Sequence, residues 1–206
     1  EIYTLSLHDA LPISIHAFAG AVERLQKEKD AIAGVILCSA KKTFFAGAEL
    51  KDLLKYGPDD GPGIFAWLEE TKRHFRGLDK LGKPVVAALE GAALGGGWEL
   101  ALAAHCRICL NDERIELGLP EATLGLLPGA SGITKTVRLL GLQAALPMLM
   151  EGKTLRPQEA AKLGAFIEFT GSSLASPDAD ARMSRFADAI RRSEEHTSEL
   201  QSPIHI

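Results

Sequence analysis

The chain has 206 residues, of which 46% are hydrophobic and 24% charged, and its formal net charge is -4 at pH 7. This balance is typical of a soluble globular domain with one core, and no apolar run is long enough to insert into a membrane. The charge is far from the basic excess of nucleic-acid-binding proteins, which excludes a nucleic-acid partner of the usual kind. Three cysteines are too few for a disulfide framework, so a reducing compartment is expected.

The first half of the chain is expected to begin with a helix over residues 17–29, because its apolar residues recur at helical spacing. Residues 33–39 form a continuous apolar run rich in β-branched residues, which is typical of a strand buried on both faces. A short helix over 48–56 and a turn over 57–63 should follow. They lead into a long amphipathic helix that carries Phe65, Leu68, Phe75 and Leu78.

The second half alternates in the same way and shows no internal repeat. Pro84 opens a second buried strand over 85–90, and a helix over 98–104 follows it. The remaining strands and helices are expected, in chain order, at 106–110 (strand), 114–118 (strand), 131–163 (helices), 165–169 (strand) and 178–191 (helix). Regular alternation of this kind predicts one α/β domain.

The two ends of the chain differ in character from the rest. Residues 1–13 (EIYTLSLHDALPI) and 192–206 (RSEEHTSELQSPIHI) resemble translations of the two ends of a common sequencing adapter. Both are therefore interpreted as non-native segments, and 14–191 as the natural part. A disordered polar tail is the alternative for 192–206. Without the two ends, acidic and basic residues balance, so the negative charge indicates nothing about a partner.

The stretch GAALGGGWEL, residues 91–100, places three glycines directly before a helix. It is not a dinucleotide-binding fingerprint, because Leu100 stands where the last glycine is required. A phosphate-binding loop is excluded because Pro147 stands five residues before Gly152, where that motif needs glycine. The serine near residue 131 lacks the G-x-S-x-G pattern of a nucleophile elbow, since position 133 is Ile.

What remains is a tight turn before a helix whose first N–H groups have no intrahelical partner and attract negative charge. If that charge is an enolate, such N–H groups form half of an oxyanion hole, with each donor contributing about 3–4 kcal/mol. FFAGAEL, residues 44–50, offers a second N–H at Ala48. Glu99 and Glu121 could divide proton transfer at such a site. Taken alone, the glycines could be only a tight turn and the glutamates only solvated acids.

Three separated stretches, TFFAGAELKDL, GKPVVAALEGAALGGGWELALA and LGLPEATLGLLPG, resemble the enoyl-CoA hydratase/isomerase (crotonase) family. The resemblance spans about residues 33–165 and is closest to the hydratase portion of multifunctional fatty-acid oxidation proteins. It implies a crotonase-like ββα spiral core with surrounding helices, here truncated at both ends. The residues 14–191 would then be a partial hydratase domain.

The resemblance also implies roles for particular residues. Ala48 and Gly96 match the oxyanion-hole N–H groups, and Glu99 and Glu121 match the two hydratase carboxylates. Weaker candidates for substrate binding are Ala46, Gly47, Lys51, Gly95, Trp98 and Gly129. The sequence departs from the family at PGASG, residues 128–132, where Ala130 and Ser131 replace glycines and add bulk near the acyl pocket.

The implied reaction is hydration of trans-2-enoyl-CoA to 3-hydroxyacyl-CoA in fatty-acid β-oxidation. It would need no metal or other cofactor, with coenzyme A as the carrier of the substrate. NAD would enter only with a downstream dehydrogenase domain. Partners would be the acyl-CoA thioester and further copies, as a homotrimer or larger complex. The location would be cytoplasmic in a bacterium, or mitochondrial or peroxisomal in a eukaryote.

Three alternatives stay open at this point: an enoyl-CoA Δ3-Δ2 isomerase of the same fold, a non-catalytic or RNA-binding family member, and an inactive fragment. Two other features are interpreted as structural. Cys106 and Cys109 have C-x-x-C spacing, but no second pair completes a zinc site. His105, which follows the glycine-led helix, is interpreted as a capping or packing residue.

Overall fold

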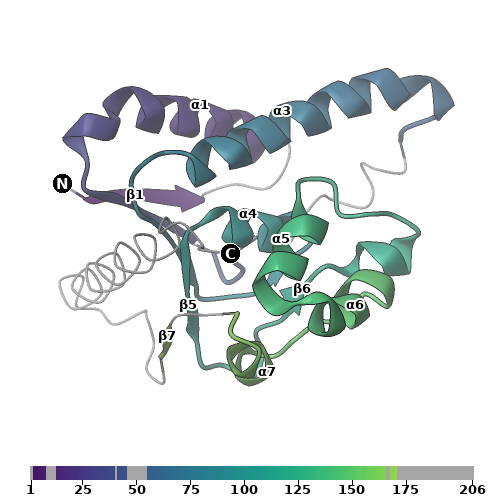
Figure 1. The fold of residues 1–206 in the computed structure, drawn as a ribbon. Helices are drawn as coiled ribbons and strands as arrows, with labels where there is room; N and C mark the ends of the chain where they lie inside the picture. The colour runs from purple at the N-terminus through teal and green to yellow at the C-terminus, as the bar shows by residue number, and fades with distance from the viewer. Residues whose placement is uncertain (1, 8–12, 40, 46–54, 166–167, 171–206) are drawn as a thin grey trace, which may run out of the picture.

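A parallel β-sheet organises the fold of the computed structural model, which describes residues 2–7, 13–39, 41–45, 55–165 and 168–170 (Figure 1). The strand order in the described residues is β1-β2-β3-β5-β7, with every neighbouring pair parallel. The strands are β1 (Ile2–Leu7), β2 (Gly34–Ser39), β3 (Val85–Leu89), β5 (Cys106–Leu110) and β7 (Glu168–Thr170). A second, two-stranded parallel sheet pairs β4 (Ala93–Leu94) with β6 (Leu117–Gly118).

The strands expected at 33–39, 85–90 and 106–110 are confirmed as β2, β3 and β5. Their continuous apolar runs suit a parallel sheet that is covered on both faces. Within β2, Val35 and Leu37 belong to the main core, whereas Ile36 packs on the other face of the sheet with Val86 and Ile108. The alternation follows from the period of two in a strand.

The edge strand β1 lies inside residues 1–13, the segment left out of the fold prediction. It pairs in register with β2 from Ile2 opposite Gly34 to Leu7 opposite Ser39. Isoleucine, tyrosine and threonine favour extended backbone, so IYTLSL suits an edge position. The guanidinium of Arg24, on the following helix, lies 5.8 Å from the centre of the Tyr3 ring.

Helices α1 (Ile13–Glu28) and α3 (Gly61–Asp79) lie side by side over one face of the sheet (Figure 1). Phe18 and Phe75 join them in an edge-to-face contact with ring centres 5.6 Å apart. Both long helices were expected, but Phe65, one of the apolar residues of the amphipathic pattern in the second, is not buried. Its side chain is 65% exposed, because the first half of α3 extends beyond the remainder of the fold.

The helical region expected over 131–163 contains α5 (Gly132–Leu140), α6 (Leu142–Met150) and α7 (Pro157–Lys162). The strand expected at 114–118 is shorter than predicted: only Leu117 and Gly118 pair in β6. Short 3-10 turns are η1 (Lys29–Ala31), η2 (Pro58–Asp60) and η3 (Pro120–Leu124). The short helix expected at 48–56 falls mostly outside the described residues, and the helix at 178–191 and the tail at 192–206 do so entirely.

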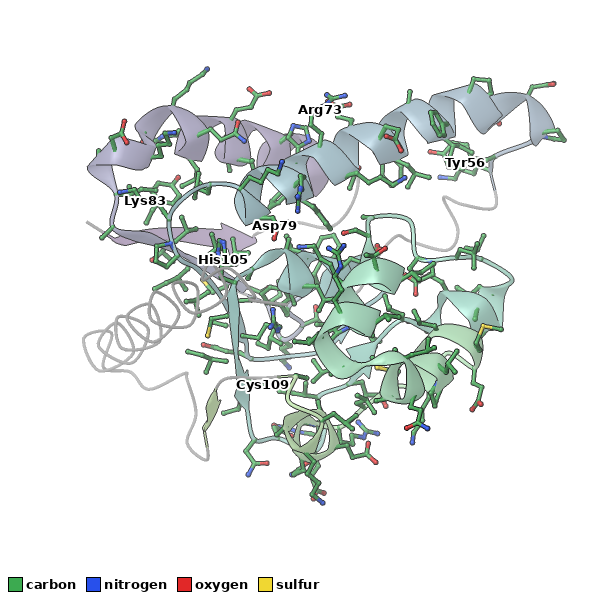
Figure 2. The ribbon with its side chains drawn as sticks, in the orientation of Figure 1. Tyr56, Arg73, Asp79, Lys83, His105 and Cys109 are labelled. Atoms are coloured by element: carbon green, nitrogen blue, oxygen red, sulfur yellow. The ribbon has the colours of Figure 1, made fainter. Side chains whose placement is uncertain are left out.

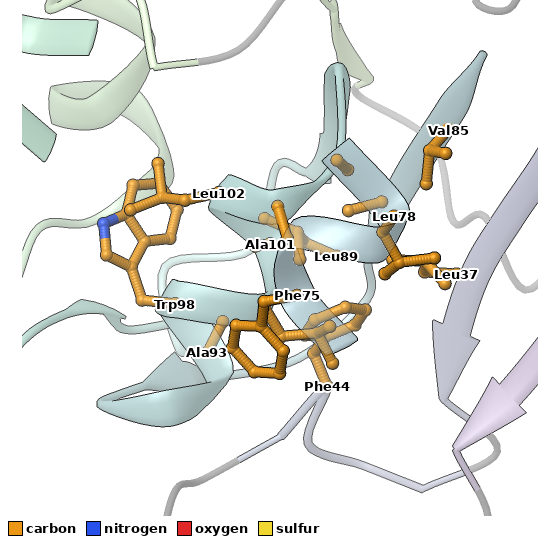
Figure 3. Close-up of a cluster of buried hydrophobic side chains, with 14 of the residues drawn as sticks. Leu37, Phe44, Phe75, Leu78, Val85, Leu89, Ala93, Trp98, Ala101 and Leu102 are labelled. Carbon is orange, nitrogen blue, oxygen red and sulfur yellow. The ribbon is translucent and has the colours of Figure 1, made fainter. Parts of the chain in front are cut away.

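The central helix α4 (Gly96–Ala103) is surrounded by the core, and seven of its eight residues are buried. Figure 3 shows Trp98, Ala101 and Leu102 of this helix beside a cluster that includes Phe44, Phe75 and Leu89. A helix that is apolar on nearly every face is stable only when fully enclosed. The one acidic side chain of α4, Glu99, is therefore buried with it.

Candidate active site

The turn that opens α4 depends on glycine. Gly95 precedes the helix with φ of 55°, a conformation that side-chain-bearing residues rarely adopt. The first intrahelical bond runs from the Glu99 N–H to the Gly95 carbonyl, at 3.0 Å. The N–H groups of Gly96, Gly97 and Trp98 therefore precede the helical hydrogen-bond ladder and form the positive end of the helix dipole.

Gly97 is required because two backbone segments pack closely against each other at this position. A Cβ atom at this position would lie 1.9 Å from the carbonyl oxygen of Phe45. That carbonyl accepts a hydrogen bond from the Leu94 N–H at 3.2 Å, so the backbone around Phe45 is paired with the backbone that leads into α4. The absence of a side chain at Gly97 thus serves close backbone packing and positions the turn.

Glu99, in the first turn of α4, is 3% exposed, and its carboxyl group is held by backbone donors from another element. The N–H groups of Ala130 and Gly132 each donate to Oε1 at 2.7 Å. Burial raises the pKa of the Glu99 carboxyl, whereas these two hydrogen bonds and the charge of Lys72 lower it. The result is a buried carboxyl group whose anion is partly compensated.

Glu121 approaches the same turn from η3. A Cβ atom on Gly95 would lie 2.9 Å from Glu121 Oε1, so the carboxyl group contacts the glycine turn directly. Its Oε2 is buried and has no hydrogen-bond partner among the described residues. Burial, with a further contribution from the charge of Glu99, raises the pKa of Glu121 to about 6. A carboxyl group of this kind can deliver a proton near neutral pH.

The structure thus brings together four of the residues expected at the site: Gly95, Gly96, Glu99 and Glu121. Trp98 does not join them. Its side chain is 0% exposed and belongs to the hydrophobic core cluster, where Figure 3 shows it with Leu102 and other apolar side chains.

Gly129 lies on the loop after η3, where a Cβ atom would be 2.9 Å from Leu68 Cδ2 of α3. The loop therefore packs closely against α3, and the expected role of Gly129 in substrate binding stays a prediction. Ala46, Gly47, Ala48 and Lys51 lie outside the described residues, so their expected roles stay predictions.

The role of residues 130–132 was not expected from the sequence. Ala130 and Ser131 were expected to add bulk near the acyl pocket, whereas the backbone of this segment binds the Glu99 carboxylate. Ser131 has φ of 87° and is the only non-glycine residue with positive φ among those described. The glycines on either side of Ala130 and Ser131 were the available signal, since such spacing marks an unusual turn before a helix.

The end of α4 is fixed by charged and polar groups. Lys135 Nζ lies 3.0 Å from Asp79 Oδ1 and donates to the Leu102 carbonyl at 3.0 Å. His105 Nδ1 accepts a hydrogen bond from the Val85 N–H at 3.1 Å, which confirms its structural interpretation. Figure 2 shows Asp79 and His105 where the end of α3 meets the sheet.

Arg107, on β5, supports the same end of α4. It is 6% exposed and donates to the carbonyl oxygens of Ala165, Ala104 and Ala101 at 2.9, 3.0 and 3.4 Å. Burial lowers the pKa of this guanidinium, but its ordinary pKa is so high that it remains charged. Arg107 and Lys135 together therefore fix the C-terminal end of the helix that carries Glu99.

The described residues combine backbone donors at a helix start with two carboxyl groups in different environments. Such an arrangement can bind a developing negative charge and move protons beside it. In the described part of the chain, no three His, Cys, Asp or Glu side chains gather to hold a metal ion. Nor does any described helix have the length and apolar character needed to cross a membrane.

The fold and the site together identify the chain as an α/β protein with a crotonase-like architecture. Among solved structures, an enoyl-CoA hydratase from Bacillus anthracis is 26% identical, with a TM-score of 0.79 over 99% of this chain and 81% of that chain. An enoyl-CoA hydratase from Thermoplasma volcanium is 28% identical, with a TM-score of 0.73 over 87% of this chain and 67% of that chain. The crotonase-like fold expected from the sequence is confirmed.

The sequence profile of the enoyl-CoA hydratase/isomerase family matches residues 12–200, and the chain belongs to this family. The fatty acid oxidation complex subunit alpha of Shewanella baltica is 44% identical over 141 residues, which cover 67% of this chain and 19% of that protein. The subunit alpha of Idiomarina loihiensis is 38% identical over 154 residues, covering 74% of this chain and 21% of that protein. The chain thus spans about a fifth of the length of these curated relatives.

Proposed function

We propose that this chain carries an enoyl-CoA hydratase site, which adds water across the double bond of a trans-2-enoyl-CoA. The observation that carries the proposal is the pairing of Glu99 and Glu121 beside the first turn of α4. Glu99 is anchored by two backbone N–H groups, and Glu121 contacts the glycine turn at Gly95. The names of the similar proteins support the same substrate class.

In the proposed reaction, the thioester oxygen binds at the Gly96 N–H and, as a second donor, the Ala48 N–H. Glu99 holds the water and accepts one of its protons while the oxygen bonds to the β-carbon. The C=C electron pair moves into the thioester enolate, which the oxyanion hole stabilises. Collapse of the enolate takes a proton from the Glu121 carboxyl group to the α-carbon, and exchange with solvent restores both glutamates.

This chemistry draws on general acid–base catalysis by side chains and on backbone electrostatics. Coenzyme A enters as part of the substrate, and the proposed steps use no metal or redox cofactor. By analogy with the bacterial fatty acid oxidation relatives, we place the protein in the bacterial cytoplasm. From the family resemblance alone, we propose that the protein assembles as a homotrimer or a larger complex.

The test is loss of the enoyl absorbance of trans-2-butenoyl-CoA on addition of the full 206-residue chain. Glu99→Gln and Glu121→Gln should each lower kcat by about 100-fold or more, because each removes one proton-transfer group. Glu113→Gln is the matched control, since Glu113 is exposed on a turn. It should leave the rate unchanged.

An isomerase gives a different result. Conversion of a 3-enoyl-CoA to the 2-enoyl-CoA that persists in Glu99→Gln but not in Glu121→Gln would replace hydration by isomerisation as the function. A folded chain that catalyses neither reaction would overturn the proposed activity altogether.

A further inference from the structure

The two glutamates of the site are held in different ways. Both hydrogen bonds to Glu99 fall on Oε1, and they come from residues two positions apart, Ala130 and Gly132. No backbone donor from another element is shown on Glu121, whose Oε2 is buried without a partner in the described structure. Among the described residues, backbone donors from another element therefore bind the carboxyl group of Glu99, and none is shown for Glu121.

The residue between the two donors has the conformation that this arrangement requires. Successive backbone N–H groups form an anion-binding concavity, called a nest, in a turn or where a right-handed residue is followed by a left-handed one. Ser131 has φ of 87° and ψ of 7°. It makes no side-chain hydrogen bond to the start of α5, so an N-capping role does not account for its conformation.

A side-chain-bearing residue in this region is strained, and such strain persists where the surroundings require it. Here the surroundings are tightly packed. A Cβ atom on Gly132 would lie 2.8 Å from both Cγ and Oε1 of Glu99 and 3.1 Å from Leu119 Cδ2. The carboxyl group thus lies directly against the backbone of the turn.

We propose that Ala130–Gly132 is a backbone nest that keeps Glu99 in its anionic form with Oε1 occupied, and that Ser131 is the positioning residue that shapes it. Both donors bind Oε1, so Oε2 of Glu99 takes no part in the nest. Its importance for hydration rests on the proposed function, in which Glu99 must be the proton acceptor while Glu121 is the donor. The nest itself is a property of Glu99 and can be measured without catalysis.

Other charged groups also act on Glu99. The Lys72 ammonium on α3 lowers the pKa of its carboxyl group, and burial raises it. Glu121 on η3 interacts with it as a like charge. Lys72 and Glu121 are both retained in every variant below, so a change in the titration of Glu99 reports on the nest.

The direct experiment replaces the amide that links Ser131 to Gly132 by an ester in the full-length protein, which removes one N–H donor and alters no side chain. Difference infrared spectroscopy then follows the carboxylate band that Glu99→Gln abolishes. Loss of a donor to the charged form should raise the pKa of Glu99 by about one unit. If the ester leaves this titration as in the wild type, the proposal is overturned.

Side-chain variants test the role of Ser131. Ser131→Gly keeps access to positive φ and should preserve the titration, whereas Ser131→Val, which is β-branched, should raise the pKa of Glu99 as the ester does. Thr136→Val, a buried change of similar shape on α5, is the control and should have no effect. A Ser131→Val protein with an unchanged titration would exclude Ser131 as the positioning residue, and the ester decides the nest if Ser131→Val does not fold.

Measurements of enoyl-CoA hydration distinguish the proposed nest from the proposed hydratase function. A shifted titration in a protein that hydrates no enoyl-CoA would keep the nest and overturn the function. In an active enzyme, the acid limb of the kcat/KM profile should move to higher pH in the ester variant, in step with the titration. An active enzyme whose acid limb and Glu99 titration both stay in place would keep the function and overturn the nest.

Discussion

A Cβ atom on Gly95 would lie 2.9 Å from Glu121 Oε1, so the absence of a side chain at the head of α4 determines where the carboxyl group of η3 can lie. The two residues belong to different elements, and Gly95 also donates its N–H to the Gly118 carbonyl at 2.9 Å. Backbone pairing therefore fixes Gly95, and Glu121 has to accommodate any added atom.

Gly95→Ala should for this reason impair catalysis more than folding. The backbone at Gly95, with φ of 55° and ψ of -125°, lies outside the left-handed helical region and costs an alanine about 1–3 kcal/mol, and the new methyl group displaces the carboxyl group of Glu121. We expect kcat to fall about 100-fold, because a misplaced acid contributes little to proton transfer. Urea unfolding and enoyl-CoA hydration, measured on the same preparation, give the two quantities.

Gly125→Ala is the control for positive φ at a site where an added Cβ atom meets no other group. Gly125 has φ of 70°, but no atom lies within 4 Å of the Cβ position. Because Gly125 lies in the left-handed helical region, this variant should lose about 1–2 kcal/mol of unfolding free energy and keep its kcat. Equal losses of kcat in the two variants would show that strain, and not displacement of Glu121, explains the Gly95 effect.

A second prediction concerns Gly97, where an added Cβ atom would meet the Phe45 carbonyl oxygen at 1.9 Å. Neither partner is a flexible side chain, so the backbone itself must move. We expect Gly97→Ala to lower the free energy of unfolding by about 3 kcal/mol or more. Gly63→Ala, in the exposed first turn of α3 with no atom within 4 Å, should instead raise it by about 0.5–1 kcal/mol. A Gly97→Ala protein as stable as the wild type would contradict the backbone contact.

The central strands could be predicted because the apolar pattern that identifies each strand lies within its own residues. The runs at 33–39 and 85–90 are apolar throughout, as both faces of a parallel sheet require. The exposure of Phe65 could not be predicted from its helical spacing. Amphipathic spacing shows that a side chain lies on the apolar face of a helix, but not whether another element covers that part of it.

The candidate site could likewise be predicted only in part. Glu99 and Glu121 could be selected from motifs, whereas the contacts that distinguish them join residues far apart in the sequence. Ala130 and Gly132 lie 31 and 33 positions from the Glu99 that they bind. Their contribution comes from backbone N–H groups, which every non-proline residue carries, so residue identity gives little indication of it.

Arg107 provides a third prediction, on the support of α4. Arg107→Met should lower the free energy of unfolding by about 3 kcal/mol, since it leaves the carbonyl groups of Ala101, Ala104 and Ala165 without a charged donor. Arg114→Met is the control, because the Arg114 side chain is 90% exposed and its ion pair with Asp112 lies in water. That change should cost less than about 1 kcal/mol. Similar urea midpoints for both variants would show that the buried hydrogen bonds add little.

The fourth prediction follows from the pKa of Glu121, which burial raises from 4.5 to about 6. Between these values the unfolded chain loses the proton first, so this carboxyl group makes the free energy of unfolding fall as pH rises from 4.5 to 6. Glu121→Gln cannot ionise and should lack this component of the decline. Its melting temperature relative to the wild type should therefore be higher at pH 7 than at pH 4.5. Glu113→Gln, on an exposed turn, should show no such difference. A Glu121→Gln protein whose relative stability is the same at both pH values would show that Glu121 titrates as an ordinary solvated carboxyl group.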